Sequence, residues 1–337
     1  MKKGFLLLLS IFWALGLCAQ IPNGYYNEAK GLKGDKLKSA LHNIIKDHKT
    51  YSYDALRDYL LSESDEDPDN SDNVILIYTG KSIPKTDFNA GKDGWNREHV
   101  WAKSHGDFGT GRPAGTDAHH IRPCDVTVNS SRGNKDFDMG GEPHKEAKGC
   151  FTDRDSWEPR DEVKGDVARM IMYMAVRYEG EKNEPDLEMS ETVGHGKAPL
   201  HGVKSVLLEW NRLDPPSDFE KNRNEVVYSY QKNRNPFIDH PEYADLIWTV
   251  DVSLDESENL KPAFTFNTTN KTFSVDLSAV SDNDVDAQIF DMNGVAIEAV
   301  KMKSGQQNTF SLVSYQKGVY ILRLNVENKF FAYKLVL

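Results

Sequence analysis

Apolar residues recur at helical spacing in two long stretches of the chain. The positions are Leu37, Leu41, Ile44 and Ile45 near the N-terminus, and Val163, Val167, Met170, Ile171, Met174 and Tyr178 in the middle. A repeat of three to four residues places such side chains on one face of a helix. We therefore expect two core helices, and we interpret the Met-rich stripe as packing rather than as a cofactor site.

Between these helices the pattern predicts a buried strand, and after it the order strand, long loop, strand and helix over residues 96–134. VILIY, residues 74–78, is typical of a buried strand, and AHHIR, residues 118–122, of a strand with its two histidines on opposite faces. The Gly- and Pro-rich residues 106–115 are expected to form the loop. Pro123 and Asp125 follow, and we expect Asp125 to cap the next helix.

Residues 263–337 have a different pattern, in which apolar and polar positions alternate in short runs typical of strands. The runs are FTF, TFSVDL, VDAQIFD, VAIEAV, GVYILRLNV and FFAYKLVL, with turns expected at Asn293-Gly294 and around Glu327-Asn328-Lys329. The polar, acidic residues 251–262 precede them and have the composition of a linker. We expect a small all-β sandwich without catalytic groups, joined by this linker to a larger domain at 21–250.

The N-terminal residues 1–20 combine two lysines with an apolar run from Phe5 to Leu17 and a short polar boundary. This layout is typical of a secretory signal peptide and is too short for a stable membrane span. No other segment has the length and apolar character of a span, so we expect an exported protein without stable membrane insertion. Cys124 and Cys150 then remain, and we expect them to form a disulfide in an oxidising compartment, with two buried free thiols as the alternative.

The most informative residues for function lie between Asn96 and Asn134. Glu98 is adjacent to His99, and Asn129 follows downstream. Cleavage of a phosphodiester needs a base and a hard cation. His99 can be the base, because its ordinary pKa is about 6.5, and Glu98 with Asn129 can supply the oxygen ligands that Mg²⁺ prefers. Adjacent strand residues point to opposite faces, so we expect a twist, bulge or strand end at 97–100.

Other residues of this segment are candidates for substrate contacts. Of His119 and His120, we expect one to face the site and the other the core or solvent. Basic residues that are candidates for holding phosphates are Arg97, Arg112, Arg122, Arg132 and Lys135, with solvated surface positions as the alternative. Arg132 is the preferred clamp, because it lies about one helical turn after Asn129.

A zinc site is the alternative of a different chemical class. Its ligands would be His99, His105, His119, His120 and Cys124. Neither an HExxH motif nor closely spaced cysteine pairs accompany these residues, and a zinc site would leave Asn129 without a role. We therefore favour magnesium.

The formal net charge of −11 argues against a broadly basic surface for nucleic acid. Much of the acid lies outside the candidate site, as in ESDEDPDN at 63–70. Attraction for phosphates must therefore be local, which predicts weak, salt-sensitive binding that is indifferent to base sequence.

The run Arg97-Glu98-His99-Val100, with Asp117-x-His119-His120-x-x-Pro123-x-x-x-x-x-Asn129-x-x-Arg132-x-Asn134, resembles the bacterial endonuclease I nucleases of the ββα-metal group. The resemblance extends from Tyr25 to about Trp248. It implies an α+β fold with a ββα-metal core surrounded by helices. It further implies that His99 is the general base and that the products carry 5′-phosphates. It also implies Glu98 and Asn129 as metal ligands.

The C-terminal strands resemble the sorting domain of type IX secretion substrates. The features that carry this resemblance are Gly318-Val319-Tyr320 and a last strand that contains a lysine. This resemblance implies recognition by the type IX machinery at the outer membrane, after export through the periplasm, and release or surface attachment. A carbohydrate-binding or adhesion module is the alternative.

These observations predict a secreted or cell-surface, Mg²⁺-dependent, sequence-nonspecific endonuclease. DNA is the expected substrate, RNA is a second candidate, and Mn²⁺ and Ca²⁺ are candidate substitutes for Mg²⁺. We expect a monomer. The alternative function is a cell-surface binding or adhesion protein built on an inactive nuclease fold.

Overall fold

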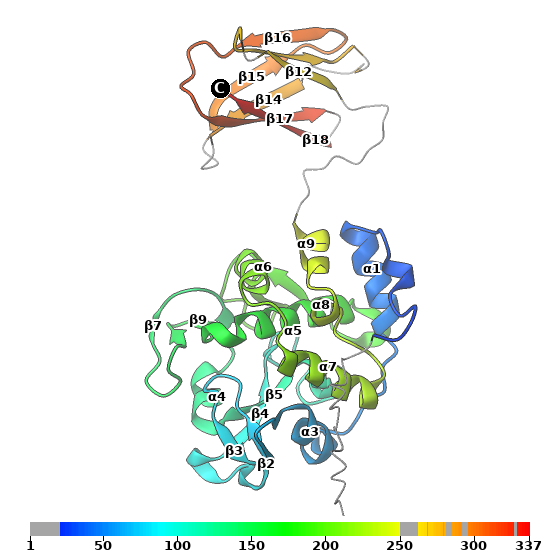
Figure 1. Ribbon diagram of the computed structural model, residues 1–337, viewed down its shortest axis with the longest axis vertical. Coiled ribbons are helices and arrows are strands. Elements are labelled where there is room, and N and C mark those ends of the chain that lie inside the picture. Colours follow the sequence, from blue (N-terminus) through cyan, green and yellow to red (C-terminus); the bar gives the residue numbers. More distant parts are fainter. Residues whose placement is uncertain are drawn as a thin grey trace, which may run out of the picture. The chain divides into compact units, whose positions relative to one another are not determined.

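The computed structural model describes residues 21–249, 262–267, 269–278, 280, 285–291, 296–326 and 329–337. The chain divides into two compact units, an N-terminal unit of residues 1–248 and a C-terminal unit of residues 249–337 (Figure 1). The expected leader at 1–20, the linker up to residue 261 and the turn residues Asn293, Gly294, Glu327 and Asn328 lie outside the described residues.

Helices are the longest elements of the N-terminal unit. Their bounds are α1 (Gly34–Ile45), α2 (Tyr53–Ala55), α3 (Ser62–Ser64), α4 (Val126–Arg132), α5 (Lys164–Arg177), α6 (Lys204–Leu213), α7 (Asp218–Gln231), α8 (Pro236–Asp239) and α9 (Glu242–Trp248), with a π-helix at Leu56–Leu61 between α2 and α3. Helix α5 is the centre of the unit, because every residue from Gly165 to Arg177 is buried. Both predicted core helices are confirmed as α1 and α5, and the Met-rich stripe packs in the core.

Four small sheets complete this unit. They pair as β1-β2-β3, β4-β5, β6-β9-β8-β7 and β10-β11. The strands are β1 (Glu66–Asp67), β2 (Asn70–Ile75), β3 (Ser82–Pro84), β4 (Trp95–His99), β5 (Ile121–Asp125), β6 (Asp136–Phe137), β7 (Glu142–Pro143), β8 (Phe151–Thr152), β9 (Ser156–Glu158), β10 (Glu188–Ser190) and β11 (Leu200–Val203).

Two predicted strands are shorter than expected. Strand β2 ends at Ile75, and the rest of VILIY is a buried turn in which Ile77 donates a 3.0 Å hydrogen bond to the Pro123 carbonyl of β5. In AHHIR, residues Ala118–His120 form a 3₁₀ turn instead of a strand. The cause is local, because the Asp117 carboxylate accepts a 3.0 Å hydrogen bond from the His119 N–H and so caps that turn.

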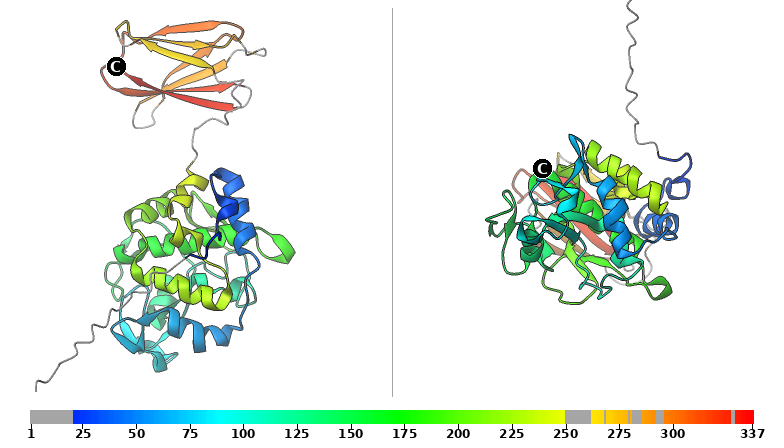
Figure 2. Two further views of the ribbon diagram at one scale, coloured as in Figure 1. Left: turned by 45° about the vertical axis from the view of Figure 1, so that its right-hand side comes forward. Right: turned by 90° about the horizontal axis from the view of Figure 1, so that it is seen from below.

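The C-terminal unit is a β-sandwich, as predicted (Figure 2). Its strands are β12 (Ala263–Asn267), β13 (Thr272–Asp276), β14 (Val285–Phe290), β15 (Ala296–Met302), β16 (Gln307–Ser311), β17 (Val319–Val326) and β18 (Lys329–Val336). They form the sheets β12-β13-β16 and β15-β14-β17-β18, and both contribute to one core that contains Phe273, Ile289 and Leu322. The sequence pattern did not predict β16, whose only apolar residue is Phe310.

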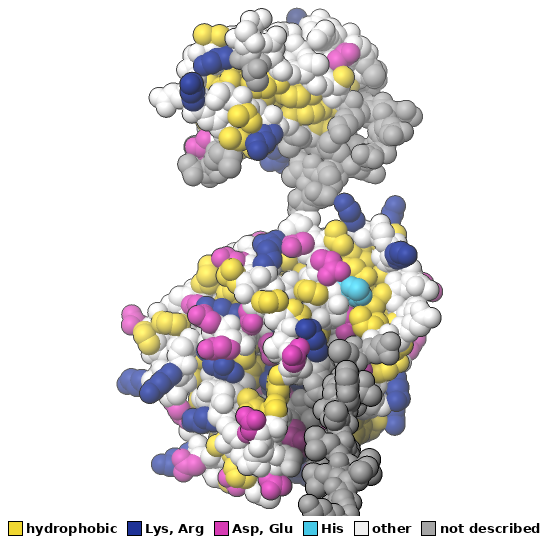
Figure 3. Space-filling model, viewed as in Figure 1, with side chains coloured by type: hydrophobic (Ala, Val, Ile, Leu, Met, Phe, Trp, Pro, Cys, Tyr) yellow, Lys and Arg dark blue, Asp and Glu magenta, His cyan; other side chains and the backbone are white. Residues whose placement is uncertain are grey.

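The overall class is therefore α+β, with the helical and mixed unit followed by an all-β unit. Among the described helices, none is both long enough and apolar enough to cross a membrane. On the face of the N-terminal unit drawn in Figure 3, basic and acidic side chains are interspersed, without one broad basic area.

Candidate active site

Strands β4 and β5 with helix α4 bring the key residues of the motif together. The two strands pair antiparallel, with Trp95 opposite Asp125 and His99 opposite Ile121, and α4 begins directly after β5. Asn129 of α4 then ties the helix to β4, because its Nδ2 donates to Oδ1 of Asn96 at 2.7 Å and to the Arg97 carbonyl at 3.1 Å. The predicted strand, loop, strand and helix order is confirmed.

Glu98, His99 and Asn129 line one cleft of about 460 Å³. The other residues around it are Tyr53, Phe88, Asn89, Asn96, Arg97, Ala102, Lys103, Ser104, Gly133 and Asn134. The pairing of β4 with β5 is regular up to His99, where the strand ends. Of the three irregularities expected at 97–100, the strand end is the one observed, and it lets adjacent residues serve one site.

The Glu98 carboxylate is buried, with 2% of the residue exposed. Its Oε1 accepts a 2.7 Å hydrogen bond from the Tyr78 hydroxyl and lies 3.4 Å from Nη1 of Arg132. Burial raises the pKa of Glu98, against the opposing effects of the Arg132 charge and the Tyr78 hydrogen bond. Both of these polar contacts use Oε1, which leaves Oε2 available for a ligand.

The His99 ring has a defined tautomer. Its Nε2 lies 3.1 Å from the Gly115 carbonyl, which only accepts hydrogen bonds, so Nε2 carries the proton and Nδ1 has the free lone pair. The ring stacks on Tyr53 and lies beside His120, with centroid distances of 5.6 and 5.5 Å. Burial, with the neighbouring His120, holds the pKa of His99 well below its ordinary value, so the imidazole is neutral at neutral pH.

Oxygen atoms in this cleft fit a hard divalent cation. Asn129 donates through its Nδ2 to Asn96 and Arg97, and this orientation leaves its carbonyl oxygen Oδ1 available for a ligand. Glu98 likewise has Oε2 available, because its contacts with Tyr78 and Arg132 use Oε1. One carboxylate and one amide oxygen suit Mg²⁺, which retains several waters.

Arg132 does not have the position expected of a phosphate clamp. It is fully buried, and its guanidinium donates to the carbonyls of His99 at 3.1 Å and Val100 at 2.6 Å. As the helical spacing predicted, Arg132 lies on the side of α4 that faces β4, but its side chain is buried and does not line the cleft. The guanidinium thus hydrogen-bonds the end of β4 and pairs with Glu98, rather than with a substrate phosphate.

The two adjacent histidines also lie away from the cleft. His119 is 1% exposed, with Nε2 at 3.1 Å from the Asn233 carbonyl and its ring 4.5 Å from that of Tyr173. His120 is fully buried and bonds the Ala114 carbonyl through Nε2 at 2.8 Å. The expectation that one of the pair faces the site is therefore not met, and His120 instead packs behind His99.

The remaining basic residues of the motif occupy different places. Arg97 lines the cleft and lies 3.5 Å over the Tyr53 ring. Arg112 is exposed in the loop between β4 and β5 and is not among the residues that line the cleft. Arg122 is buried and paired with Asp65. Lys135 is half-buried and donates to Thr152.

Asp125 precedes α4 as predicted, but its side chain does not cap the helix. Its carboxylate accepts hydrogen bonds from Thr79 at 2.7 Å and from Lys81 at 3.0 Å. These contacts join the end of β5 to the turn after β2.

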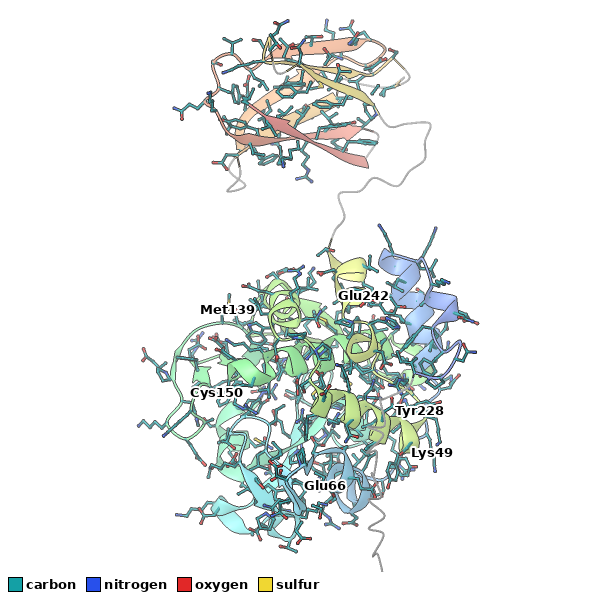
Figure 4. All side chains as sticks on the ribbon, in the orientation of Figure 1. Lys49, Glu66, Met139, Cys150, Tyr228 and Glu242 are labelled. Carbon is teal, nitrogen blue, oxygen red and sulfur yellow. The ribbon has the colours of Figure 1, made fainter. Side chains whose placement is uncertain are left out.

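The predicted disulfide is wrong, because Cys124 and Cys150 are both free and buried. Cys150, labelled in Figure 4, donates through its thiol to the Tyr78 carbonyl at 3.4 Å. Cys124 lies in β5, fully buried in the core. Burial raises the pKa of the Cys150 thiol to about 11, so both residues act as small apolar side chains.

The five ligands of the zinc alternative do not converge on one point among the described residues. His105 instead lies with Asp136 and His201, whose candidate ligand atoms are within 4.8 Å of one another. Both ring nitrogens of His105 already contact carbonyls, those of Leu200 and Asn134. A second group, Glu179, Asp186 and Glu188, is half-buried to exposed, and its members Glu179 and Glu188 pair with Lys38.

Several site residues were missed in the sequence. Tyr53 and Phe88 reach the cleft from segments before the motif, and Tyr78 supports Glu98 from the turn after β2. No local pattern marks them. Asn134 belongs to the motif run itself and lines the cleft, so its place in that run is the sequence signal that could have identified it.

Comparisons with known proteins give two family matches and several relatives. The family model of endonuclease I matches residues 33–242, and that of the secretion system C-terminal sorting domain matches residues 267–337. The extracellular ribonuclease of Bacillus subtilis (strain 168) is 61% identical over 226 residues, which cover 66% of this chain and 78% of that protein. For the extracellular ribonuclease of Bacillus amyloliquefaciens the identity is 59% over 225 residues, with coverage of 66% and 78%.

An extracellular deoxyribonuclease of Aeromonas hydrophila is 30% identical over 129 residues, which cover 36% of this chain and 49% of that protein. The matched family region contains Glu98, His99 and Asn129. The chain therefore belongs to the endonuclease I family, and it is a secreted or cell-surface nuclease with a C-terminal sorting domain of type IX secretion.

Proposed function

We propose that this nuclease is a Mg²⁺-dependent endonuclease that hydrolyses DNA and RNA without sequence specificity and leaves 5′-phosphates. The observation that carries the proposal is the cleft in which a neutral His99 lies beside the oxygens of Glu98 and Asn129. Relatives named as ribonucleases and as a deoxyribonuclease support the two substrates.

The metal would be held by Oε2 of Glu98 and Oδ1 of Asn129, together with water. Bound there, a divalent cation neutralises charge that develops on the phosphate and on the leaving oxygen. Mg²⁺ is the proposed native ion because both ligands are hard oxygens, and Mn²⁺ and Ca²⁺ are candidate substitutes.

His99 would take the proton from the attacking water. Nδ1 is its unprotonated nitrogen, and the bond from Nε2 to the Gly115 carbonyl fixes the ring while Nδ1 gains the proton. The water oxygen bonds to phosphorus, the bond from phosphorus to O3′ breaks, and O3′ leaves with the electron pair and is protonated by solvent. Because water replaces the 2′-hydroxyl as nucleophile, the same steps apply to DNA and RNA.

Substrate phosphates would be attracted by local basic groups. Arg97 and Lys103 line the cleft, and Arg112 is exposed on the loop between β4 and β5. The opposing net charge of −11 then makes binding weak and dependent on salt. Arg132, being buried, would act on Glu98 rather than on phosphate.

The proposed domain boundaries are a signal peptide at 1–20, the nuclease domain at 21–250, a linker at 251–262 and the sorting domain at 263–337. Support comes from the division of the chain after Trp248 and from the family matches at 33–242 and 267–337. The proposed state in solution is a monomer.

A cleavage assay on supercoiled plasmid and on single-stranded RNA tests this function. We expect both to be cut with Mg²⁺ and neither with EDTA. New DNA ends should accept label from a polynucleotide kinase only after phosphatase treatment, because they carry 5′-phosphates. A folded protein that cuts neither substrate at any Mg²⁺ concentration would instead favour a binding protein on an inactive nuclease fold.

The metal assignment has its own test. Glu98→Gln and Asn129→Ala should each raise the Mg²⁺ concentration that gives half-maximal activity, since the first removes the negative charge of one ligand and the second removes the amide oxygen of the other. Asn43→Ala, at an exposed position of α1, is the control that should leave it unchanged. Recovery of EDTA-treated enzyme by Zn²⁺ alone would contradict the hard-ligand site.

A further inference from the structure

A continuous row of four buried charged or polar residues leads from Glu98 into the interior of the N-terminal unit. Oε1 of Glu98 lies 3.4 Å from Nη1 of Arg132, Nη2 of Arg132 lies 2.8 Å from Nε2 of His201, and Nδ1 of His201 lies 2.9 Å from Oδ1 of Asp136. None of the four is more than 2% exposed. Such a row costs desolvation energy, so its contacts call for an explanation.

The contacts fix the protonation of His201. Nε2 of His201 lies 2.8 Å from Nη2 of Arg132 and 3.2 Å from the Val100 carbonyl. A guanidinium only donates, so at the shorter contact Nε2 accepts, and Nδ1 carries the proton and donates to the Asp136 carboxylate. His201 is thus neutral and oriented at both nitrogens. The arrangement resembles the carboxylate and histidine pairs that orient ligands from outside a metal's own coordination shell.

Asp136 is itself anchored by the backbone. Its Oδ1 accepts from the N–H of Gly202 at 3.1 Å, and its Oδ2 accepts from the N–H of Gly194 at 2.8 Å. These bonds connect β6, β11 and the loop before β11, three segments distant in sequence from β4. Asp136 can therefore serve as a fixed reference point for the rest of the row.

Arg132 links His201 to the residues of the cleft. Besides Glu98, its guanidinium bonds the carbonyls of His99 and Val100, so it holds both the end of β4 and the carboxylate that β4 carries. Its position is in turn set by His201 on one side and by the Phe137 ring, 4.7 Å away, on the other.

We propose that His201 and Asp136 are positioning residues that, through Arg132, orient Glu98 for binding the catalytic metal. This inference rests on the proposed function, since it concerns the same metal site. It assigns a role to two residues that lie outside the cleft and that the catalytic motif does not contain.

The nearby group of His105, Asp136 and His201 does not serve as a second metal site in this account. Nδ1 of His201 donates to Asp136, and both nitrogens of His105 contact carbonyls. No ring nitrogen of the group therefore has a free lone pair that faces the other ligands.

The test measures Mn²⁺ binding to the purified full chain, stripped of metal with EDTA, by titration followed by electron paramagnetic resonance without nucleic acid. His201→Phe and Asp136→Asn should each weaken Mn²⁺ binding by about 10-fold, the usual effect of losing an outer-shell partner. His42→Phe is the matched control, because His42 is also buried and bonds a carbonyl, that of Val176 at 2.9 Å, but is not linked to Glu98. It should leave Mn²⁺ affinity unchanged.

The two variants differ in how much structure they disturb. Asn at position 136 keeps the size of Asp and can still accept from His201, but it cannot accept from the Gly194 N–H with its amide nitrogen. Asp136→Asn therefore decides the matter if His201→Phe does not fold. With either folded variant, saturating Mg²⁺ should restore most of the cleavage rate, because the lost property is metal affinity.

Outcomes for the row and for the metal site are distinguishable. Glu98→Gln must weaken Mn²⁺ binding, and if the unsubstituted chain binds no Mn²⁺ or this variant binds it equally well, the proposed metal site and the positioning role both fail. If Glu98→Gln weakens binding but the folded Asp136 and His201 variants bind like the unsubstituted chain, the positioning role is overturned and the proposed function stands.

Discussion

The Tyr78 hydroxyl donates a 2.7 Å hydrogen bond to Oε1 of Glu98, although Tyr78 lies in the turn after β2 and Glu98 in β4, 20 positions apart. The bond satisfies one oxygen of a buried carboxylate and leaves the other for a cation. Tyr78 is fully buried in the turn after β2, so the shape of that turn, which the strand prediction missed, positions a support of the candidate metal site.

Tyr78→Phe should lower the free energy of unfolding by about 1.5–3 kcal/mol, the range for a hydrogen bond to a charged group. It should also raise the Mg²⁺ concentration for half-maximal activity by about 10-fold, because Glu98 loses a partner that orients it. Chemical denaturation and a Mg²⁺ titration of activity measure the two effects.

Tyr26→Phe is the matched control, since the Tyr26 hydroxyl also donates to a carboxylate, that of Asp239, at 2.7 Å, away from the cleft. It should cost comparable stability without changing the Mg²⁺ requirement. Equal Mg²⁺ requirements for the two variants would contradict the role given to Tyr78.

Acid should destabilise the fold through its buried neutral histidines. Burial lowers the pKa of His119 and of His120 to about 4, against about 6.5 in an unfolded chain. Between these values the unfolded chain binds more protons, so stability is full above about pH 6.5 and is lost as the pH falls towards 4, by about 3 kcal/mol for each histidine.

Urea denaturation at pH 7, 5.5 and 4.5 measures this loss. His119→Gln should reduce the pH dependence, because glutamine does not titrate. A free energy of unfolding that stays constant from pH 7 to 4.5 would show that these histidines are not held neutral by the fold.

The two buried thiols predict that reductant has no effect on stability. Cys124 and Cys150 should be unreactive towards Ellman's reagent in the folded protein and reactive after denaturation in guanidinium without reductant. The melting temperature should be equal with and without dithiothreitol. A crosslinked peptide containing both cysteines in a non-reducing digest would restore the disulfide that the sequence predicted.

The C-terminal unit should be dispensable for chemistry. Every residue that lines the cleft belongs to the N-terminal unit, so a protein truncated after Asp251 should keep the plasmid cleavage rate of the full chain. In a host with type IX secretion, it should remain inside the cell envelope, whereas full-length Glu98→Gln should reach the surface or medium. Truncated protein in the medium, or loss of activity in a folded truncation, would contradict this division of roles.

The sequence predicted the parts of the site that lie close together in the chain. Glu98, His99 and Asn129 form a local motif, and the strand, loop, strand and helix between them build one cleft. Residues that support the motif come from distant segments, as with His201, which is 69 positions from Arg132. A single buried histidine or tyrosine forms no periodic pattern in the sequence, so the sequence does not reveal which residue it contacts.

Two local errors also have physical causes. The Asp117 side chain started a 3₁₀ turn at His119, where apolar and polar alternation favoured a strand. Arg132 lies on the same face of α4 as Asn129, as the helical spacing predicted. Spacing alone does not tell whether that face points to the cleft or to the interior. The guanidinium lies in the interior, where it donates to the carbonyls of His99 and Val100.

The most direct test of the central claim is the single-turnover rate of plasmid cleavage by His99→Ala at saturating Mg²⁺. We predict a rate lower by about 100-fold or more, the usual value of a general base, with plasmid affinity close to that of the unsubstituted protein. The control His240→Ala removes a half-buried histidine outside the cleft and should cut at the normal rate. A near-normal rate for His99→Ala would contradict the account, because the group proposed to take the proton from water would then be unnecessary.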